Sequence, residues 1–303
     1  MKMKINFETV NEFGNLEFLA KQLVEGFITG LHKSPYHGFS VEFAEHRLYN
    51  FGESTRHIDW KVYARTDKLF TKQYEEETNL RCQLVIDNSP SMHYPVETKG
   101  KLAFSILAAA SIALLLQKQR DAVGICTFSE KIEESTPIRS AKNHLNKLFI
   151  ILERLLQQKT VSKPTNVADV LHEIAEKNHR RSLVVIFSDM FDQTENSGEI
   201  FKALQHLKHN QHEVILFHVK DFKTEHDFQF EERPYEFIDL ETGDKLKLKP
   251  SQVRESYMND LKEYYKELKL KCAQYKIDFI EADINEDMNN ILRAYLIKRT
   301  RLK

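Results

Sequence analysis

The sequence contains little cysteine and no cysteine motif. Its 303 residues include 3 cysteines, which lie far apart at positions 82, 126 and 272. Because no C-x-x-C pair occurs, the sequence predicts neither a zinc site nor a disulfide framework. We expect three buried, reduced thiols, which are typical of a cytoplasmic protein.

An excess of charge of one sign is also missing. The chain carries 44 lysines and arginines against 45 aspartates and glutamates, so its formal net charge is -1. Proteins that bind nucleic acid or an anionic membrane usually present a basic surface, and the composition therefore predicts no nucleic-acid partner. The motif of a phosphate-binding loop, G-x-x-x-x-G-K-[ST], does not occur either.

Long hydrophobic runs are absent as well. The longest apolar stretch covers residues 102–116 and is interrupted by Ser105 and Ser111. A helix that crosses a membrane needs about 20 apolar residues, so a helix packed under a sheet explains this stretch better. Residues 1–8 also lack the apolar core of a signal peptide. We expect a cytoplasmic protein without a transmembrane segment, and a monomer, because no long apolar stripe is left unassigned.

From residue 81 onward the sequence alternates between strand and helix patterns. Strands are predicted at residues 82–86, 122–128, 183–188, 213–219 and 278–282, and helices at 99–118, 144–158, 167–177, 198–208, 251–275 and 286–298. This alternation is typical of an α/β fold in which helices cover both faces of a doubly wound, mostly parallel sheet.

The part of the chain before residue 81 follows a different pattern. A helix is predicted at residues 16–31, whereas residues 34–74 are rich in aromatic residues, glycine, histidine and arginine and show little periodicity. We therefore predict that residues 1–80 form a helix and a small β-rich addition, and that residues 81–303 form the α/β domain. A hairpin insertion is expected near residues 235–248, because Gly243 supplies the positive φ that its turn requires.

The most informative segment is Asp87-Asn88-Ser89-Pro90-Ser91, which follows the apolar run 82–86. In an open α/β sheet, ligands bind where strands end and loops begin. The D-x-S-x-S spacing places a carboxylate and two hydroxyls on one tight turn. Ligands that are all oxygen suit a hard divalent cation, above all Mg²⁺.

Two later segments offer further oxygen ligands. The apolar run 183–187 ends in Ser188 and Asp189, and Thr165 lies between two predicted helices, from where its hydroxyl could reach the same crevice. We predict one metal site formed by Asp87, Ser89, Ser91, Thr165 and Asp189. Such a site would keep residual positive charge and one open coordination position, which a carboxylate from a partner could fill.

Each of these residues also has a purely structural interpretation. Asp87 and Ser89 could close a turn, Thr165 or Asn166 could cap the following helix, and Asp189 could cap a turn.

The site itself could instead belong to a Mg²⁺-dependent hydrolase, such as a phosphatase, with Asp87 as nucleophile. Against this, Ser89 stands where a phosphatase would have an aspartate as acid and base. A structural protein with an empty site is the third alternative.

At this point the sequence shows a family resemblance. Residues 82–219 resemble a von Willebrand factor A-type domain, and the five predicted ligands match its metal-ion-dependent adhesion site. Residues 34–92, including Gly-Phe-Ser-Val-Glu-Phe at 38–43 and Gly-Glu-Ser-Thr-Arg-His-Ile-Asp-Trp at 52–60, resemble the bacterial family "domain of unknown function fifty-eight" (DUF58). One departure is Pro164, where a glycine is usual before the threonine.

The resemblance has consequences for fold and function. It implies a von Willebrand factor A/Rossmann-like sheet and no known catalytic activity. It also implies a role in complex assembly or remodelling beside a MoxR-type AAA+ ATPase. Many relatives carry membrane-spanning segments near the N-terminus, and none is predicted in this sequence. The expected function is therefore a non-enzymatic module that binds an acidic group of its partner through Mg²⁺ or another divalent cation.

Overall fold

The computed structural model describes residues 16–32, 46–49, 60–72, 80–96, 98, 100–158, 166–190, 197–240 and 243–301. The chain divides into two compact units. One contains residues 1–30 and 80–303, and the other contains residues 31–79.

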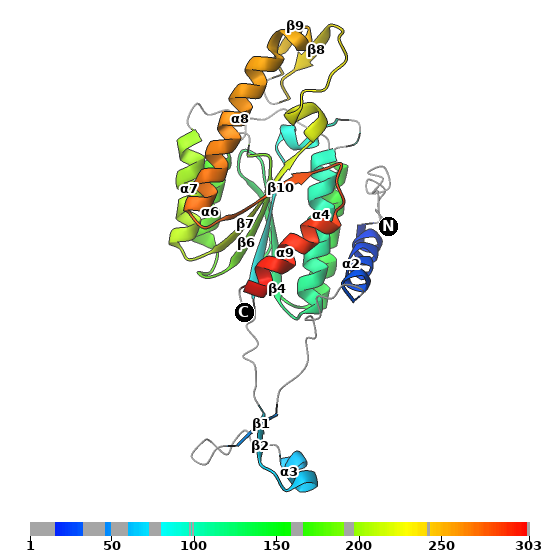
Figure 1. Ribbon diagram of the computed structural model, residues 1–303, viewed down its shortest axis with the longest axis vertical. Helices are drawn as coiled ribbons and strands as arrows, with labels where there is room; N and C mark the ends of the chain where they lie inside the picture. The colour runs from blue at the N-terminus through cyan, green and yellow to red at the C-terminus, as the bar shows by residue number, and fades with distance from the viewer. Residues whose placement is uncertain are drawn as a thin grey trace. The chain divides into compact units, whose positions relative to one another are not determined.

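The larger unit is built around a six-stranded sheet with the strand order β10-β7-β6-β3-β4-β5 (Figure 1). The strands are β3 Arg81–Asp87, β4 Ala122–Phe128, β5 Ile132–Ser135, β6 Leu183–Ser188, β7 Glu213–Lys220 and β10 Asp278–Asp283. All pairs are parallel except β4 with β5. The predicted α/β class with a mostly parallel sheet is confirmed.

The central strands are buried on both faces. In β3 every residue from Cys82 to Asp87 is buried, and in β6 every residue is buried. Strands covered by helices on both sides read as continuous apolar runs, which is why the sequence revealed them. The edge strand β5 was not predicted, because it is short and its burial alternates along only four residues.

Helices cover the two faces of this sheet. They are α4 Gly100–Lys118, α5 Lys142–Gln157, α6 Val167–Lys177, α7 Ser197–His209, α8 Pro250–Gln274 and α9 Asn289–Arg301. Figure 1 shows α6, α7 and α8 on one side of the sheet and α4 and α9 on the other. On the first side, Leu171, Leu204 and Leu268 from the three helices pack in one core with Val85 of β3.

Helix α4 occupies the centre of the opposite face. Of the described helices, it is the one that is long and apolar enough to cross a membrane, but 94% of its apolar window is buried inside the fold. Its residues from Gly100 to Leu116 are all buried. We therefore regard α4 as a core helix, as the sequence predicted.

Two peripheral elements of the larger unit also match their predictions. Helix α2, Leu16–His32, buries Leu16, Ala20, Leu23 and Val24, a spacing that defines one apolar helix face. Strands β8 Tyr235–Ile238 and β9 Lys245–Leu248 form the expected antiparallel hairpin. Gly243 between them has a φ of 79°, which other residues rarely adopt.

The smaller unit pairs β1, His46–Leu48, with β2, Phe70–Lys72, in antiparallel fashion. Between them lies α3, Trp60–Thr66, a helix of 7 residues. The sequence predicted only short strands and turns here, and that prediction was wrong for residues 60–66. A helix this short is about two turns long, so it shows no clear apolar periodicity.

Candidate functional site

The structure places two of the predicted ligands at the switch point of the sheet, where the order of the strands reverses. β3 and β6 are neighbours; the chain continues from β3 to β4 on one side, and from β6 to β7 on the other. Ligands of open α/β sheets bind at the carboxyl ends of such a strand pair. Asp87 is the last residue of β3, and Asp189 directly follows β6.

Asp87 is fully buried and held at both carboxylate oxygens. Its Oδ1 accepts a hydrogen bond from the Ser89 backbone N–H at 2.8 Å, and its Oδ2 accepts one from the Ser188 hydroxyl at 2.6 Å. Burial and, after it, the charge of Asp189 raise the pKa of Asp87 to about 7, although these hydrogen bonds lower it. The two carboxylates are therefore close enough to repel each other.

The two predicted serine ligands lie together on the turn that follows β3. The Ser89 and Ser91 hydroxyl oxygens are 3.0 Å apart. Ser89 precedes the short helix η2, Pro90–His93, and Ser91 lies within it. The carboxylate and the two hydroxyls are thus gathered on one tight turn, as the D-x-S-x-S spacing predicted.

The turn that carries Asp189 is fixed by three neighbouring side chains. His218 of β7 donates from Nε2 to the Asp189 backbone carbonyl at 2.9 Å. Met190 has a φ of 52°, and its N–H donates to the Ser188 hydroxyl at 2.8 Å. The Tyr264 hydroxyl of α8 donates to the Met190 carbonyl at 2.5 Å. These bonds hold Asp189 in a fixed position at the strand end.

Sequence reasoning missed two charged residues at this site. Lys101, the second residue of α4, is 1% exposed, and its Nζ lies 2.9 Å from Asp189 Oδ2. The same ammonium forms an ion pair with Glu225. Burial alone would lower the pKa of Lys101, but Asp189 and Glu225 together raise it above its usual value, so the group is charged. A lysine at the start of an otherwise apolar helix was the available signal.

The described residues fit a hard divalent cation in donor chemistry and in charge. Asp87, Asp189 and Glu225 contribute three carboxylates against the single ammonium of Lys101, which leaves two negative charges in excess when all are ionised. Carboxylate and hydroxyl oxygens are the ligands such cations prefer. Within the described ranges, His, Cys, Asp and Glu side chains alone do not form a cluster of three or more that could hold a metal ion. The candidate site therefore depends on its serine hydroxyls.

The remaining predicted ligand, Thr165, lies outside the described residues, together with Pro164. Its role stays a prediction. The neighbouring Asn166 has the capping role that the sequence offered as an alternative. Its side chain accepts a hydrogen bond from the Asp169 N–H at 3.1 Å at the start of α6.

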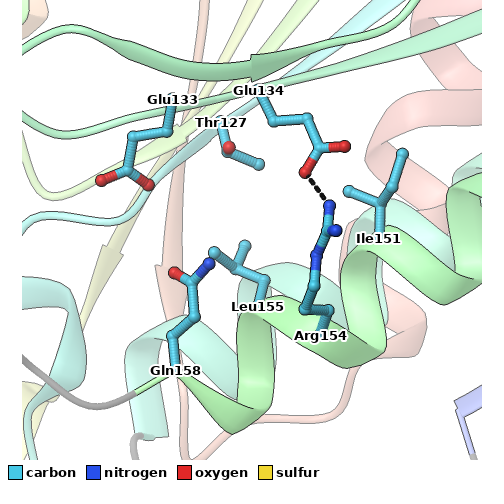
Figure 2. Close-up of a pocket in the computed structure, with 7 residues that line it drawn as sticks. All are labelled: Thr127, Glu133, Glu134, Ile151, Arg154, Leu155 and Gln158. Carbon is cyan, nitrogen blue, oxygen red and sulfur yellow. Dashed lines mark hydrogen bonds and ion pairs between the residues drawn. The ribbon is translucent and has the colours of Figure 1, made fainter.

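A pocket flanks the Asp87 turn on the β4 side. It is lined by Thr127, Glu133, Glu134, Ile151, Arg154, Leu155 and Gln158, and Figure 2 shows the Glu134 carboxylate pointing to the Arg154 guanidinium, with which it forms an ion pair. Asn88 reaches this pocket, because its Nδ2 donates to Glu133 at 2.8 Å and to Gln158 at 3.2 Å. The pocket and the candidate site are therefore adjacent.

Comparison with protein families and curated relatives gives one family. The family model described as "Protein of unknown function DUF58" matches residues 45–267. The "Uncharacterized protein Rv1480" of Mycobacterium tuberculosis is 26% identical over 174 residues, which are 57% of this chain and 55% of that protein. The "Uncharacterized protein Mb1516" of Mycobacterium bovis matches with the same values. The chain thus spans about half the length of these relatives.

Two solved structures show more distant likeness. The conserved hypothetical protein BatB from Bacteroides thetaiotaomicron is 12% identical, with a TM-score of 0.43, over 74% of this chain and 100% of that chain. A von Willebrand factor type A protein from Catenulispora acidiphila is 13% identical, with a TM-score of 0.33, over 47% of this chain and 34% of that chain. At such scores, neither structure carries a conclusion about activity.

Proposed function

The chain belongs to the DUF58 family, whose model matches residues 45–267, and we propose that it is a non-enzymatic protein-interaction module that binds an acidic partner group through a divalent cation. One observation carries the proposal: Asp87 and Asp189 converge at the switch point of the sheet, inside a buried excess of negative charge. When bound, Mg²⁺ or a similar cation would supply residual positive charge and an open coordination position for a carboxylate.

The chain's own residues would hold the cation and keep the site rigid. Asp87, Ser89, Ser91 and Asp189 would be ligands, with Thr165 as the predicted fifth. Ser188 orients Asp87, and His218 fixes the Asp189 turn. A site whose ligands are held by neighbouring hydrogen bonds is pre-organised for binding.

The residue two positions after Asp87 favours a binding role over a hydrolytic one. Ser89 stands there, where a phosphatase would need a carboxylic acid as general acid and base.

The family resemblance supports a MoxR-type AAA+ ATPase as the partner, with complex assembly or remodelling as the process. In this proposal, the ATPase presents an aspartate or glutamate to the cation, and the neighbouring pocket at Asn88 and Glu133 extends the contact surface. We further propose that the protein acts as a monomer in the cytoplasm.

A cation titration tests the proposed site. Because a ligand that binds only the native state stabilises it, saturating Mg²⁺ should raise the Tm of the wild-type chain by about 5 °C, and EDTA should reverse the rise. Asp87→Ala and the double variant Ser89→Ala/Ser91→Ala should lose this response. Ser111→Ala is the matched control, since Ser111 is a buried serine whose hydroxyl donates to a carbonyl within α4. A Mg²⁺ response that survives Asp87→Ala would contradict the proposal.

Two further measurements test the function. Capture of the ATPase on immobilised wild-type chain should require Mg²⁺ and should fail in EDTA. Turnover of p-nitrophenyl phosphate with Mg²⁺ should stay at the level of the Asp87→Asn variant. Phosphatase activity that disappears with Asp87→Asn would replace the binding role with a hydrolytic one.

A further inference from the structure

Among the described residues, Lys101 is a charged residue that contacts Asp189. The proposed function gives it no role. Its ammonium is buried and donates to Asp189 Oδ2 at 2.9 Å, while it also pairs with Glu225. We propose that Lys101 is a built-in competitor of the divalent cation for Asp189 and that it sets the cation affinity of the site. This inference rests on the proposed function.

The competition follows from the geometry of the ion pair. An ammonium is a compact point charge, and at 2.9 Å it occupies part of the Asp189 carboxylate that a cation would need. A divalent cation bound between Asp87 and Asp189 would also lie only a few ångströms from the Lys101 charge. Repulsion between like charges is strong where burial excludes water, so the ammonium and the cation disfavour each other.

Glu225 gives Lys101 an alternative partner. The Glu225 carboxylate is itself fixed, because its Oε2 accepts the Asp221 backbone N–H at 2.7 Å at the start of η3, Phe222–His226. An ammonium has three donors, so Lys101 can release Asp189 and keep Glu225. The charge that competes with the cation therefore does not have to leave the protein interior when the cation binds.

The chain provides a matched control at the same edge of the sheet. Lys220, at the end of β7, is also 1% exposed and pairs with a carboxylate, Glu281, at 2.9 Å. Its ammonium lies 4.3 Å from the centre of the Phe222 ring and 4.4 Å from that of Tyr265. Lys220→Met thus removes the same charge at the same depth without touching Asp189.

The experiment measures the affinity of the full chain for Mg²⁺ and Mn²⁺ alone, by calorimetric titration. Removal of a positive charge next to the cation should tighten binding by about tenfold or more in Lys101→Met. Lys101→Arg keeps the charge and should stay near the wild-type affinity. Glu225→Gln should weaken binding by a similar factor, because the ammonium then relies on Asp189. Lys220→Met should change the affinity by less than about twofold.

Each result has a defined meaning. Unchanged or weaker cation binding by a folded Lys101→Met chain would overturn the inference, and so would equal tightening in Lys220→Met. If Lys101→Met fails to fold, Glu225→Gln decides, and unchanged affinity in that variant would refute the competition. If wild type binds the cation but these variants do not differ, only this inference fails. If neither the wild type nor Lys101→Met binds Mg²⁺ or Mn²⁺, the proposed function fails with it.

Discussion

Two buried lysines at the carboxyl edge of one sheet have opposite surroundings. Lys101 faces two carboxylates, Asp189 and Glu225, and these raise its pKa above the usual value despite its burial. Lys220 forms an ion pair with one, Glu281, and burial together with the charge of Lys269 lowers the pKa of Lys220 although Glu281 raises it. Both side chains are 1% exposed. Depth of burial therefore does not decide their difference.

The local ratio of carboxylates to ammonium groups explains the contrast. Glu281 is shared, because Lys269 also binds it at 2.6 Å, so two ammonium groups pair with this single carboxylate. The Lys101 neighbourhood has more carboxylates than ammonium groups, and Asp87 adds another. A cation is therefore attracted more strongly to the carboxylates around Lys101 than to Glu281, which supports the proposed position of the site.

The largest expected effect compares the two lysines in stability. In EDTA, Lys101→Met should lower the free energy of unfolding by about 3–5 kcal/mol, because it leaves the buried Asp189 and the partly buried Glu225 without this partner. Lys220→Met should cost about 1–2 kcal/mol, since Glu281 is partly exposed and keeps Lys269. Urea unfolding of both variants gives the two values. Equal losses would contradict the difference in charge ratio.

The next effect is the pH dependence that His218 confers. Burial, followed by the charge of Lys220, lowers the pKa of His218 from 6.5 to about 4, although Asp189 and Glu281 act in the opposite direction. Because the folded pKa lies below the unfolded one, the contribution of His218 is complete above pH 6.5 and is lost as the pH falls towards 4. The loss should reach up to about 3 kcal/mol.

Two variants separate the contribution of His218 to the pH dependence from those of other titrating groups. Urea unfolding between pH 7 and 4.5 should show a smaller acid loss in His218→Gln than in wild type. In Lys220→Met the acid loss should also shrink, because one positive neighbour of His218 is gone. An unchanged loss in both variants would assign the acid sensitivity to other residues.

A smaller effect concerns the support of Asp87. Ser188→Ala removes the hydroxyl that donates to Asp87 Oδ2 and that accepts from the Met190 N–H. A buried group that loses its partner costs about 1–3 kcal/mol, so the free energy of unfolding should fall by that amount in urea. Ser111→Ala, whose hydroxyl donates only within its own helix, should lose less. If Ser188→Ala is as stable as Ser111→Ala, the hydrogen bond from Ser188 to Asp87 does not stabilise the fold.

The smallest effect should come from the shared Glu281. Burial would raise its pKa, but the hydrogen bonds from Lys269 and Lys220, together with the charges of both lysines, hold the pKa at about 2 instead of 4.5. Its stabilising contribution is therefore complete above pH 4.5 and is lost as the pH falls towards 2. The side chain is 36% exposed, so solvent screening should limit the effect to less than about 1 kcal/mol. The stability difference between wild type and Glu281→Gln should narrow from pH 5 to pH 3; a constant difference would argue against this ion pair.

Much of the fold was visible in the sequence because its central strands are buried on both faces. β4 and β6 were predicted with their observed bounds, since continuous apolar runs mark such strands. The edge strand β5 and the short helix α3 were not predicted, because neither is long enough to show a period. Local pattern thus reveals the elements that are buried and long.

The candidate site was only partly predictable for a different reason. Asp87, Ser89, Ser91 and Asp189 follow apolar runs, so their place at strand ends could be read directly. Lys101 and Glu225 are 124 positions apart, and their ion pair depends on how α4 and η3 pack, which no local pattern encodes. The charge balance of the site is therefore a property of the folded chain.

The acidic strand β5 restricts how another protein can approach this sheet. It is only four residues long, and Glu133 and Glu134 stand on it at the outer margin next to β4. Carboxylates on a short border strand discourage an incoming chain from extending the sheet through backbone hydrogen bonds. Recognition from this side must then rely on side chains. The partner's residue types would decide selectivity, and its capacity to form a strand would not.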